Sequence, residues 1–327
     1  MSSSPDGFVA LDRVDQSSSI HLLRTTMQRA IRTALLSFVP LFALGAIQPV
    51  VAQSVQTGFA PVHNGRLYYE MSGSGDAVVF VHGNLGDRRH WDLQFEAFAK
   101  RFKTVRYDVR GFGRSSLPKE AEPYSHYKDL EVLLDDLGIK GAHLVGWSMG
   151  SGIVVDFAMA LPERTRSLVT VGPWVFGYSS PATQEIFDGM RQVQAALAAG
   201  GPTAGVEAWV SSPFFHKTIV DPAAGKRFRA IADDYTFWHF AHADPQGTLQ
   251  SNAAGRVADI RVPTLIVAGE RDLAACLELA DVLAKSVPGS RKVVVAGAGH
   301  MVHMDKPEEF NEIVSAFVSS VTTPAPR

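Results

Sequence analysis

The sequence predicts an α/β fold built on a mostly parallel sheet with helices on both faces. Short apolar runs rich in β-branched residues alternate along the chain with longer stretches of helical periodicity. Glycines and polar residues follow several of these runs directly, and sites in open α/β sheets form at the carboxyl ends of strands. The strands with the clearest pattern are Ala77–Val81, Ala142–Val145, Val262–Gly269 and Arg291–Val295.

The other elements continue this alternation. Near the start, Phe59–Val62 and Leu67–Met71 flank Asn64-Gly65, which is typical of a β-hairpin turn. A further strand ends near Val171. The last helix runs from about Pro307 to Ser319 and has two glutamates in its first turn, where the helix dipole favours acids. The remaining predicted helices are Trp91–Lys100, His126–Leu137 and Ser151–Ala160.

The segment Gly146-Trp147-Ser148-Met149-Gly150 joins a predicted strand to a predicted helix. A serine at such a junction lies on a sharp turn, so its hydroxyl points out of the sheet. The flanking glycines leave space where side chains would collide as the strand becomes a helix. Glycine and serine are abundant, so this pattern also arises by chance, and its significance depends on residues further along the chain.

Asp272 and His300 each lie just beyond a predicted strand. Asp272 follows Val262–Gly269, and His300 follows Arg291–Val295 and the turn Gly297-Ala298-Gly299. Ser148, Asp272 and His300 are therefore expected at the same edge of the sheet. A histidine there can accept the proton of a serine that attacks a carbonyl, and an aspartate can orient the histidine ring.

With this order of serine, aspartate and histidine, residues from about Phe59 to Val321 resemble the α/β-hydrolases. The resemblance implies a mostly parallel eight-stranded sheet with helices on both faces and an inserted helical cap. It also implies that Ser148, Asp272 and His300 are catalytic.

A second match to this family follows the strand Ala77–Val81, in the segment His82-Gly83-Asn84-Leu85-Gly86. The resemblance places one oxyanion donor at the backbone N–H of Asn84 and the other at that of Met149. Two such donors would stabilise the negative charge of a tetrahedral intermediate.

Two neighbouring residues compete with the assigned catalytic groups. Glu270 is an alternative acid, but the family's Gly-x-x-Asp pattern favours Asp272. His303 is an alternative base, but His300 directly follows the Gly-x-Gly turn, and His303 is expected to be structural. The His-x-x-His pair has no carboxylate or cysteine at a usable spacing beside it, so neither a metal nor a cofactor is predicted.

Two further sets of residues are expected to be structural. In Tyr107–Ser115, which also resembles a family signature, Asp108 and Arg110 are expected to hold a loop together. Cys276 is the only cysteine, so an intramolecular disulfide is excluded, and a buried structural thiol is the preferred interpretation over a reactive one.

The predicted cap covers about residues 175–250, where the alternation of strands and helices stops. Helical patterns replace it, with breaks at Gly200-Gly201-Pro202 and Ser212-Pro213. In this family a cap covers the pocket and sets specificity, so some of its apolar side chains are expected to line an acyl or aryl pocket. The large apolar residues of this region are Trp174, Phe176, Trp209, Phe214, Phe215, Tyr235, Phe237, Trp238 and Phe240.

The sequence thus predicts a serine hydrolase that cleaves a carboxylic ester with a hydrophobic portion through an acyl-enzyme. The alternatives are a lactonase, including one for acyl-homoserine lactones, a C–C bond hydrolase, an amidase or aminopeptidase, and a perhydrolase-like enzyme. A ligand-binding protein without activity is a further alternative, although a binder does not need all three catalytic groups. Acyl chain length and oligomeric state stay open.

The first 52 residues have the pattern of an extension followed by a signal peptide. The basic stretch Met27–Arg32 precedes an apolar run, Ala34–Ile47, which is shorter than the roughly 20 residues of a membrane span. Translation is predicted to start at Met27, with cleavage near Ala52 and a hydrolase domain over residues 53–327. An uncleaved anchor is the alternative. The prediction is a secreted or periplasmic bacterial protein without stable membrane association.

The formal net charge of the chain is only −2. Binding to nucleic acid or to an anionic membrane surface depends on clusters of positive charge, and this balance does not favour it. The expected partner is a small-molecule ester or lactone substrate.

Overall fold

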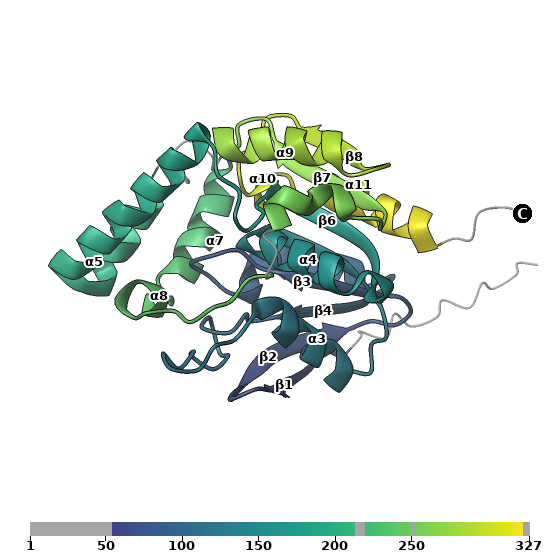
Figure 1. The fold of residues 1–327 in the computed structure, drawn as a ribbon, viewed down its shortest axis with the longest axis horizontal. Coiled ribbons are helices and arrows are strands. Elements are labelled where there is room, and N and C mark those ends of the chain that lie inside the picture. Colours follow the sequence, from purple (N-terminus) through teal and green to yellow (C-terminus); the bar gives the residue numbers. More distant parts are fainter. Residues whose placement is uncertain (1–53, 213–219, 250–252, 323–327) are drawn as a thin grey trace, which may run out of the picture. The chain divides into compact units, whose positions relative to one another are not determined.

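The computed structural model describes residues 54–212, 220–249 and 253–322 (Figure 1). The predicted signal peptide with its cleavage site near Ala52, and the cap residues Phe214 and Phe215, lie outside these ranges, so export stays a prediction. Within them, no helix combines the length and the apolar character that a membrane crossing requires.

Eight strands form one sheet, as predicted, and their order in it is β1-β2-β4-β3-β5-β6-β7-β8. The pairs β1–β2 and β2–β4 are antiparallel, and all later pairs are parallel. Buried residues fill β3 and β7 completely, which explains their continuous apolar sequences. The strands are β1 (Gln56–Val62), β2 (Gly65–Ser72), β3 (Ala77–Val81), β4 (Lys103–Tyr107), β5 (Ala142–Ser148), β6 (Thr165–Pro173), β7 (Thr264–Gly269) and β8 (Arg291–Val295).

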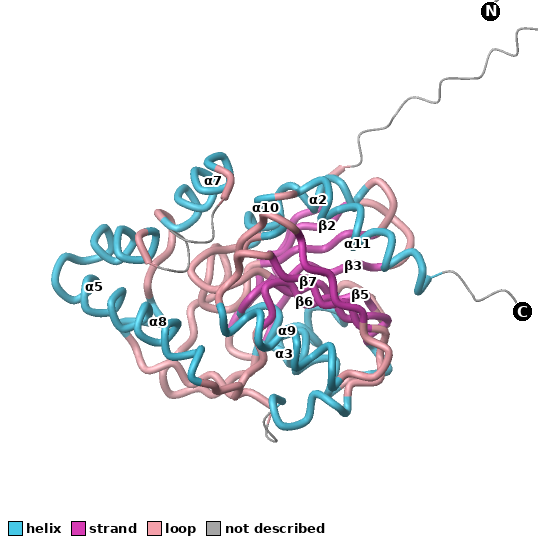
Figure 2. The backbone as a smooth tube through the Cα atoms, turned by 90° about the horizontal axis from the view of Figure 1, so that it is seen from above, coloured by secondary structure: helices cyan, strands magenta, loops and turns pink. Residues whose placement is uncertain are grey.

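Helices cover both faces of this sheet (Figure 2). On one face α2 (Asp92–Ala99) packs against α11 (Pro307–Thr322), and on the other α3 (His126–Asp136) packs against α4 (Met149–Ala160). The helix α9 (Ala274–Ser286) contacts β6 and β7. Short helical turns connect some of these elements. They are η1 (Arg88–Trp91), η2 (Pro162–Arg164), η4 (Ala253–Asp259) and α10 (Val302–Asp305).

The region between β6 and β7 is helical and fits the predicted cap. It contains η3 (Pro181–Thr183), α5 (Gln184–Val210), α7 (Pro222–Ala232) and α8 (Trp238–Ala241), and the three α-helices lie together beside the sheet (Figure 1). The predicted break at Gly200-Gly201-Pro202 is confirmed, because Gly201 has a φ of 71° and kinks α5. Glycine adopts this conformation without a steric penalty, and proline cannot continue the hydrogen bonding of the preceding turn.

Candidate active site

Ser148 lies where β5 turns sharply into α4. Its backbone has a φ of 52° and a ψ of −117°, a conformation that residues other than glycine rarely adopt. The turn also needs both flanking glycines. A Cβ on Gly146 would lie 2.2 Å from the carbonyl oxygen of Gly150, and one on Gly150 would lie 2.2 Å from that of Val81. The sequence therefore folds into a strained turn that presents Ser148 at the sheet edge.

Asp272 and His300, which are far apart in sequence, form a buried hydrogen-bonded pair. The Oδ1 atom of Asp272 is 2.7 Å from Nδ1 of His300, and the side chains are 0% and 2% exposed. The same Oδ1 accepts the backbone N–H of Leu273 at 2.7 Å. Because a carboxylate accepts, Nδ1 of His300 donates, and this contact fixes the orientation of the ring. Glu270 instead accepts the N–H of Gly297 and supports the turn before His300.

The backbone around His300 leaves its ring little freedom. Nε1 of Trp147 donates to the carbonyl oxygen of His300 at 2.8 Å. Gly172 approaches from β6, with a φ of 48°, and a Cβ there would lie 2.8 Å from Nδ1 of His300. The close approach explains a glycine inside a strand at this point. Strands β5 and β6 thus hold the histidine from two sides.

The loop after β3 carries Asn84 and is held by a buried histidine. Nε2 of His82 accepts the backbone N–H of Val109 at 2.9 Å, and Nδ1 donates to the carbonyl oxygen of Gly83 at 2.7 Å. The side chain of Asn84 accepts the N–H of Leu85 at 2.9 Å. This hydrogen bond engages the amide oxygen of Asn84 and fixes the side chain in the loop after β3.

A cavity of about 230 Å³ joins Ser148 and His300 with Asn84 and Met149. Met149 is the first residue of α4, where backbone N–H groups have no acceptor within the helix. The structure thus brings four of the five predicted site residues to one cavity, and the fifth, Asp272, reaches it through His300. The other lining residues are Trp147, Trp174, Phe176, Ile186, Phe187, Met190, Trp209, Gln246 and Cys276.

Of the apolar cap residues singled out in the sequence, Trp174, Phe176 and Trp209 line this cavity. Tyr235, Phe237, Trp238 and Phe240 do not line it. The first three of them are buried, and Tyr235 and Phe240 each pack against Phe237.

Sequence reasoning missed three lining residues that share one face of α5: Ile186, Phe187 and Met190. Ile186 and Met190 are four residues apart, a spacing that marks one helix face. This spacing was the available signal, although it does not distinguish a pocket wall from packed core.

His303, the predicted structural histidine, is fully buried and packs on Trp91 with ring centroids 4.3 Å apart. Burial lowers the pKa of His303 well below the ordinary histidine value, so the ring is neutral. Its location away from the cavity lining agrees with the structural interpretation.

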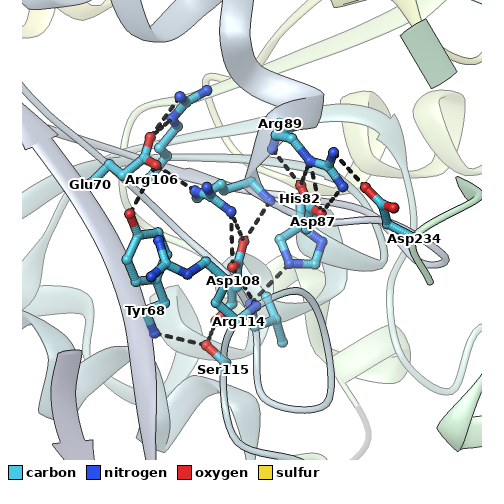
Figure 3. Close-up of polar contacts among 12 residues, drawn as sticks. Tyr68, Glu70, His82, Asp87, Arg89, Arg106, Asp108, Arg114, Ser115 and Asp234 are labelled. Carbon is cyan, nitrogen blue, oxygen red and sulfur yellow. Dashed lines mark hydrogen bonds and ion pairs between the residues drawn. The ribbon is translucent and has the colours of Figure 1, made fainter. Parts of the chain in front are cut away.

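Asp108 holds together the loop that follows β4 (Figure 3). Its carboxylate accepts the backbone N–H groups of Arg88 and Arg114 and pairs with the Arg88 guanidinium at 3.1 Å. Arg88 also binds Glu70 of β2. Nearby, Arg89 binds Asp87 and extends to Asp234 of the cap. These contacts agree with the structural role expected of Asp108.

Arg110 forms a buried ion pair with Asp129 of α3, in which Nε and Nη2 donate to the two carboxylate oxygens at 2.7 and 2.8 Å. The substitution Arg110→Met is expected to lower the free energy of unfolding by about 3–5 kcal/mol, because it leaves a buried carboxylate without its partner. Urea denaturation measures this loss. The double variant Arg110→Met/Asp129→Leu should recover most of it, and equal losses in the single and double variants would contradict this explanation.

Asp156 of α4 anchors the segment that carries Gln246, since its Oδ2 accepts the N–H of Leu249 at 3.1 Å. Burial raises the pKa of Asp156 to about 6. The folded state therefore binds this proton more tightly than the unfolded state, and stability is lost as the pH rises through 6. Asp156→Asn keeps an acceptor oxygen without the charge.

We expect Asp156→Asn to raise the free energy of unfolding at pH 8 by up to about 3 kcal/mol. The gain should shrink as the pH falls from 6 to 4, where the carboxyl group of the native protein is itself neutral. Urea denaturation at pH 8 and pH 4 tests this. A gain of equal size at both values would show that the charge of Asp156 is not its cause.

A mostly parallel sheet, a serine at a strained strand–helix turn and a buried aspartate–histidine pair together define the α/β-hydrolase class. A model of the alpha/beta hydrolase family matches residues 78–313, and the chain belongs to this family. A protein of Azorhizobium caulinodans assigned as the carbamate hydrolase RutD is 30% identical over 266 residues, or 78% of this chain and 96% of that protein. The carboxylesterase YbfK of Bacillus subtilis is 25% identical over 270 residues, covering 78% and 84%. The protein is a hydrolase.

Solved structures show the same fold. A thermophilic esterase from Thermogutta terrifontis superposes with a TM-score of 0.68 at 24% identity, over 82% of this chain and all of that one. Est816, described as an N-acyl homoserine lactone degrading enzyme, has a TM-score of 0.64 at 26% identity, over 80% of this chain and all of its own.

Proposed function

We propose that the protein hydrolyses a carboxylic ester with a hydrophobic portion through Ser148, His300 and Asp272. His300 accepts the proton of Ser148 as the serine oxygen attacks the carbonyl carbon, and it then protonates the departing alcohol. A water molecule, deprotonated by the same histidine, releases the acid from the acyl-enzyme and restores the serine.

The observation that carries this proposal is the buried contact between Asp272 and His300. Because Oδ1 of Asp272 takes the Nδ1–H of His300, the neutral ring keeps its other nitrogen, Nε2, as the proton acceptor. His300 and Ser148 share the wall of one cavity. The aspartate also stabilises the imidazolium that forms when the serine proton is transferred.

The backbone N–H groups of Asn84 and Met149 are the proposed oxyanion donors. Both residues line the cavity beside Ser148, and the dipole of α4 places partial positive charge at its Met149 end. Donors held in advance by the fold stabilise the oxyanion without reorganisation during the reaction. The His82 hydrogen bonds support this function by holding the Asn84 loop to the segment after β4.

The cavity supports a substrate with an apolar acyl or aryl group. Its walls are mainly aromatic and aliphatic, and three of the aromatic side chains are Trp174, Phe176 and Trp209. Removing apolar surface from water contributes about 25 cal/mol per Å², which favours hydrophobic esters over small polar ones. The names of YbfK and of the Thermogutta terrifontis protein, both esterases, agree with this substrate class.

A lactone is the second candidate substrate, since Est816 acts on N-acyl homoserine lactones and shares 26% of its sequence with this chain. A lactone is a cyclic ester, so the same serine chemistry opens its ring. A carbamate is a further candidate substrate, because the similar protein RutD is named a carbamate hydrolase. The serine proposed above can attack either carbonyl group. A lactone keeps its departing alcohol attached to the acyl chain, whereas a carbamate has a nitrogen on the carbonyl carbon.

Hydrolysis of p-nitrophenyl esters from acetate to decanoate tests the proposal, with N-acyl homoserine lactones and carbamates assayed in parallel. We expect turnover of a medium-length ester, and the optimum chain length measures the cavity. A fluorophosphonate should attach to Ser148, and peptide mass spectrometry locates the adduct. Turnover of lactones alone would select the second candidate. An adduct on another residue of an active protein would exclude Ser148 as the nucleophile.

A further inference from the structure

Cys276 lies beside the pair formed by Asp272 and His300. It is in the first turn of α9, four residues after Asp272, and it forms part of the cavity wall together with His300. One carboxylate oxygen of Asp272, the Sγ atom of Cys276 and one ring nitrogen of His300 all lie within 4.8 Å of one another, and all three residues are buried. The proposed reaction makes no use of the thiol.

The two carboxylate oxygens of Asp272 differ in their hydrogen bonds. Oδ1 of Asp272 accepts two hydrogen bonds, from His300 and Leu273. Oδ2 is buried and has no N–H or O–H donor among the described residues, and the Cys276 thiol is the neighbour that hydrogen-bonds the carboxyl group. A thiol is a weak donor for a buried carboxylate, and a bound cation would satisfy the oxygen more fully.

We propose that Asp272, Cys276 and His300 bind a thiophilic divalent cation such as Zn²⁺ or Cd²⁺, which inhibits the enzyme. Thiolate, imidazole and carboxylate are the usual protein ligands of zinc, and three of them leave a fourth position open. In tetrahedral coordination such ligand atoms lie roughly 3.4–3.7 Å apart. Atoms that already lie within 4.8 Å of one another can reach this spacing through small movements of the three side chains. The cavity supplies the route of entry and room for a water as fourth ligand.

The charges and protons balance. Burial raises the pKa of the Cys276 thiol, and the nearby Asp272 carboxylate raises it further, so the empty site holds a neutral thiol. Binding releases that one proton, and the dication then faces one thiolate and one carboxylate. Mg²⁺ and Ca²⁺ prefer oxygen ligands in larger number, so the site should discriminate against them.

The expected inhibition follows from the ring of His300. In the empty site Nδ1 carries the proton, because it donates to Asp272. A cation on Nδ1 displaces that proton to Nε2, and the neutral ring then has no lone pair there to accept the proton of Ser148. This step of the inference rests on the proposed function, whereas metal binding itself does not.

Binding is therefore measured first, by calorimetry on the histidine-tag-free protein with Zn²⁺ and with Mg²⁺. We expect one Zn²⁺ site and no heat for Mg²⁺. Cys276→Ser and Cys276→Ala should each weaken Zn²⁺ binding at least about tenfold, since one of three protein ligands is lost. His63→Ala removes an exposed histidine outside the cluster and serves as the matched control, with unchanged affinity.

Cobalt gives a second, spectroscopic readout of the same site. Co²⁺ bound to a thiolate shows a near-ultraviolet charge-transfer band, and Cys276 is the only cysteine of the chain. The band should appear in the wild-type protein and be absent from Cys276→Ala. Zn²⁺ that binds to a protein whose cobalt form shows no thiolate band, or that binds both cysteine variants with wild-type affinity, would overturn the site. Thiolate binding without inhibition of an active esterase would overturn only the inhibitory mechanism.

Discussion

Replacing Ser148 with alanine is expected to lower kcat for ester hydrolysis by roughly 10⁴–10⁶-fold. The variant retains the cavity and the N–H groups of Asn84 and Met149, but it has no atom to form the acyl-enzyme. KM should change little, because the hydroxyl contributes to the chemical step far more than to binding. Steady-state assays on the best p-nitrophenyl ester measure both constants.

The fold of this variant should be intact, because alanine removes one oxygen atom at the cavity wall and keeps the backbone conformation, with a φ of 52°, that Ser148 already has. Ser116→Ala is the matched control. The Ser116 hydroxyl accepts the N–H of Arg66 at 3.0 Å, on a loop that lies outside the cavity lining. A folded Ser148→Ala protein with the wild-type rate would refute the proposed mechanism.

The sequence predicts the central strands well because they are buried on both faces, and the observed β3 (Ala77–Val81) matches its predicted range. The edge strand β8 (Arg291–Val295), which is largely exposed, also matches its predicted range. The hairpin follows from Asn64-Gly65, where Asn64 has a φ of 56°. The strand β4 and the helix α9 had no predicted range of their own. β4 carries polar residues such as Lys103 and Arg106 among its apolar ones, so its apolar pattern is weak.

The candidate site likewise contains some residues that the local sequence predicts and others that it does not. Ser148, Asp272 and His300 are found from local sequence, because each stands in a short pattern at the end of a strand. The Cys276 thiol gives no such signal, since it lies 24 residues before His300 and α9 alone brings it to the cavity wall. Phe187 is similar: its contact with the cavity depends on where the cap helix α5 lies over the sheet.

This difference has a physical origin. The catalytic positions depend on backbone geometry at strand ends, which glycine and turn patterns reveal. The pocket wall depends on how two layers pack, and many apolar sequences satisfy the same packing. Trp174 lines the cavity whereas Phe237 packs within the cap, although both are aromatic residues of the same region. The fold and the candidate catalytic residues are therefore easier to predict from one sequence than the residues that form the pocket wall.

Asp272→Asn tests the role of the aspartate separately from that of the nucleophile. We expect kcat to fall by about 10⁴-fold, the loss typical of Ser-His-Asp enzymes when this aspartate becomes an amide. Oδ1 of Asp272 accepts both the Leu273 N–H and the Nδ1–H of His300. An amide whose oxygen occupies this position keeps both hydrogen bonds but has no negative charge to stabilise the imidazolium. An amide whose NH₂ group occupies it loses the Leu273 hydrogen bond and donates to Nδ1 of His300, so the ring proton moves to Nε2.

Either orientation lowers kcat without a large change in shape, because a ring with its proton on Nε2 cannot accept the proton of Ser148, and a neutral amide does not stabilise the imidazolium. NMR of the imidazole nitrogens shows which tautomer the variant has, and urea denaturation should show a folded protein. Glu270→Gln is the matched control: Glu270 accepts the N–H of Gly297, a contact that the amide oxygen of glutamine can keep. A larger loss of activity in Glu270→Gln than in Asp272→Asn would identify Glu270 as the acid of the triad.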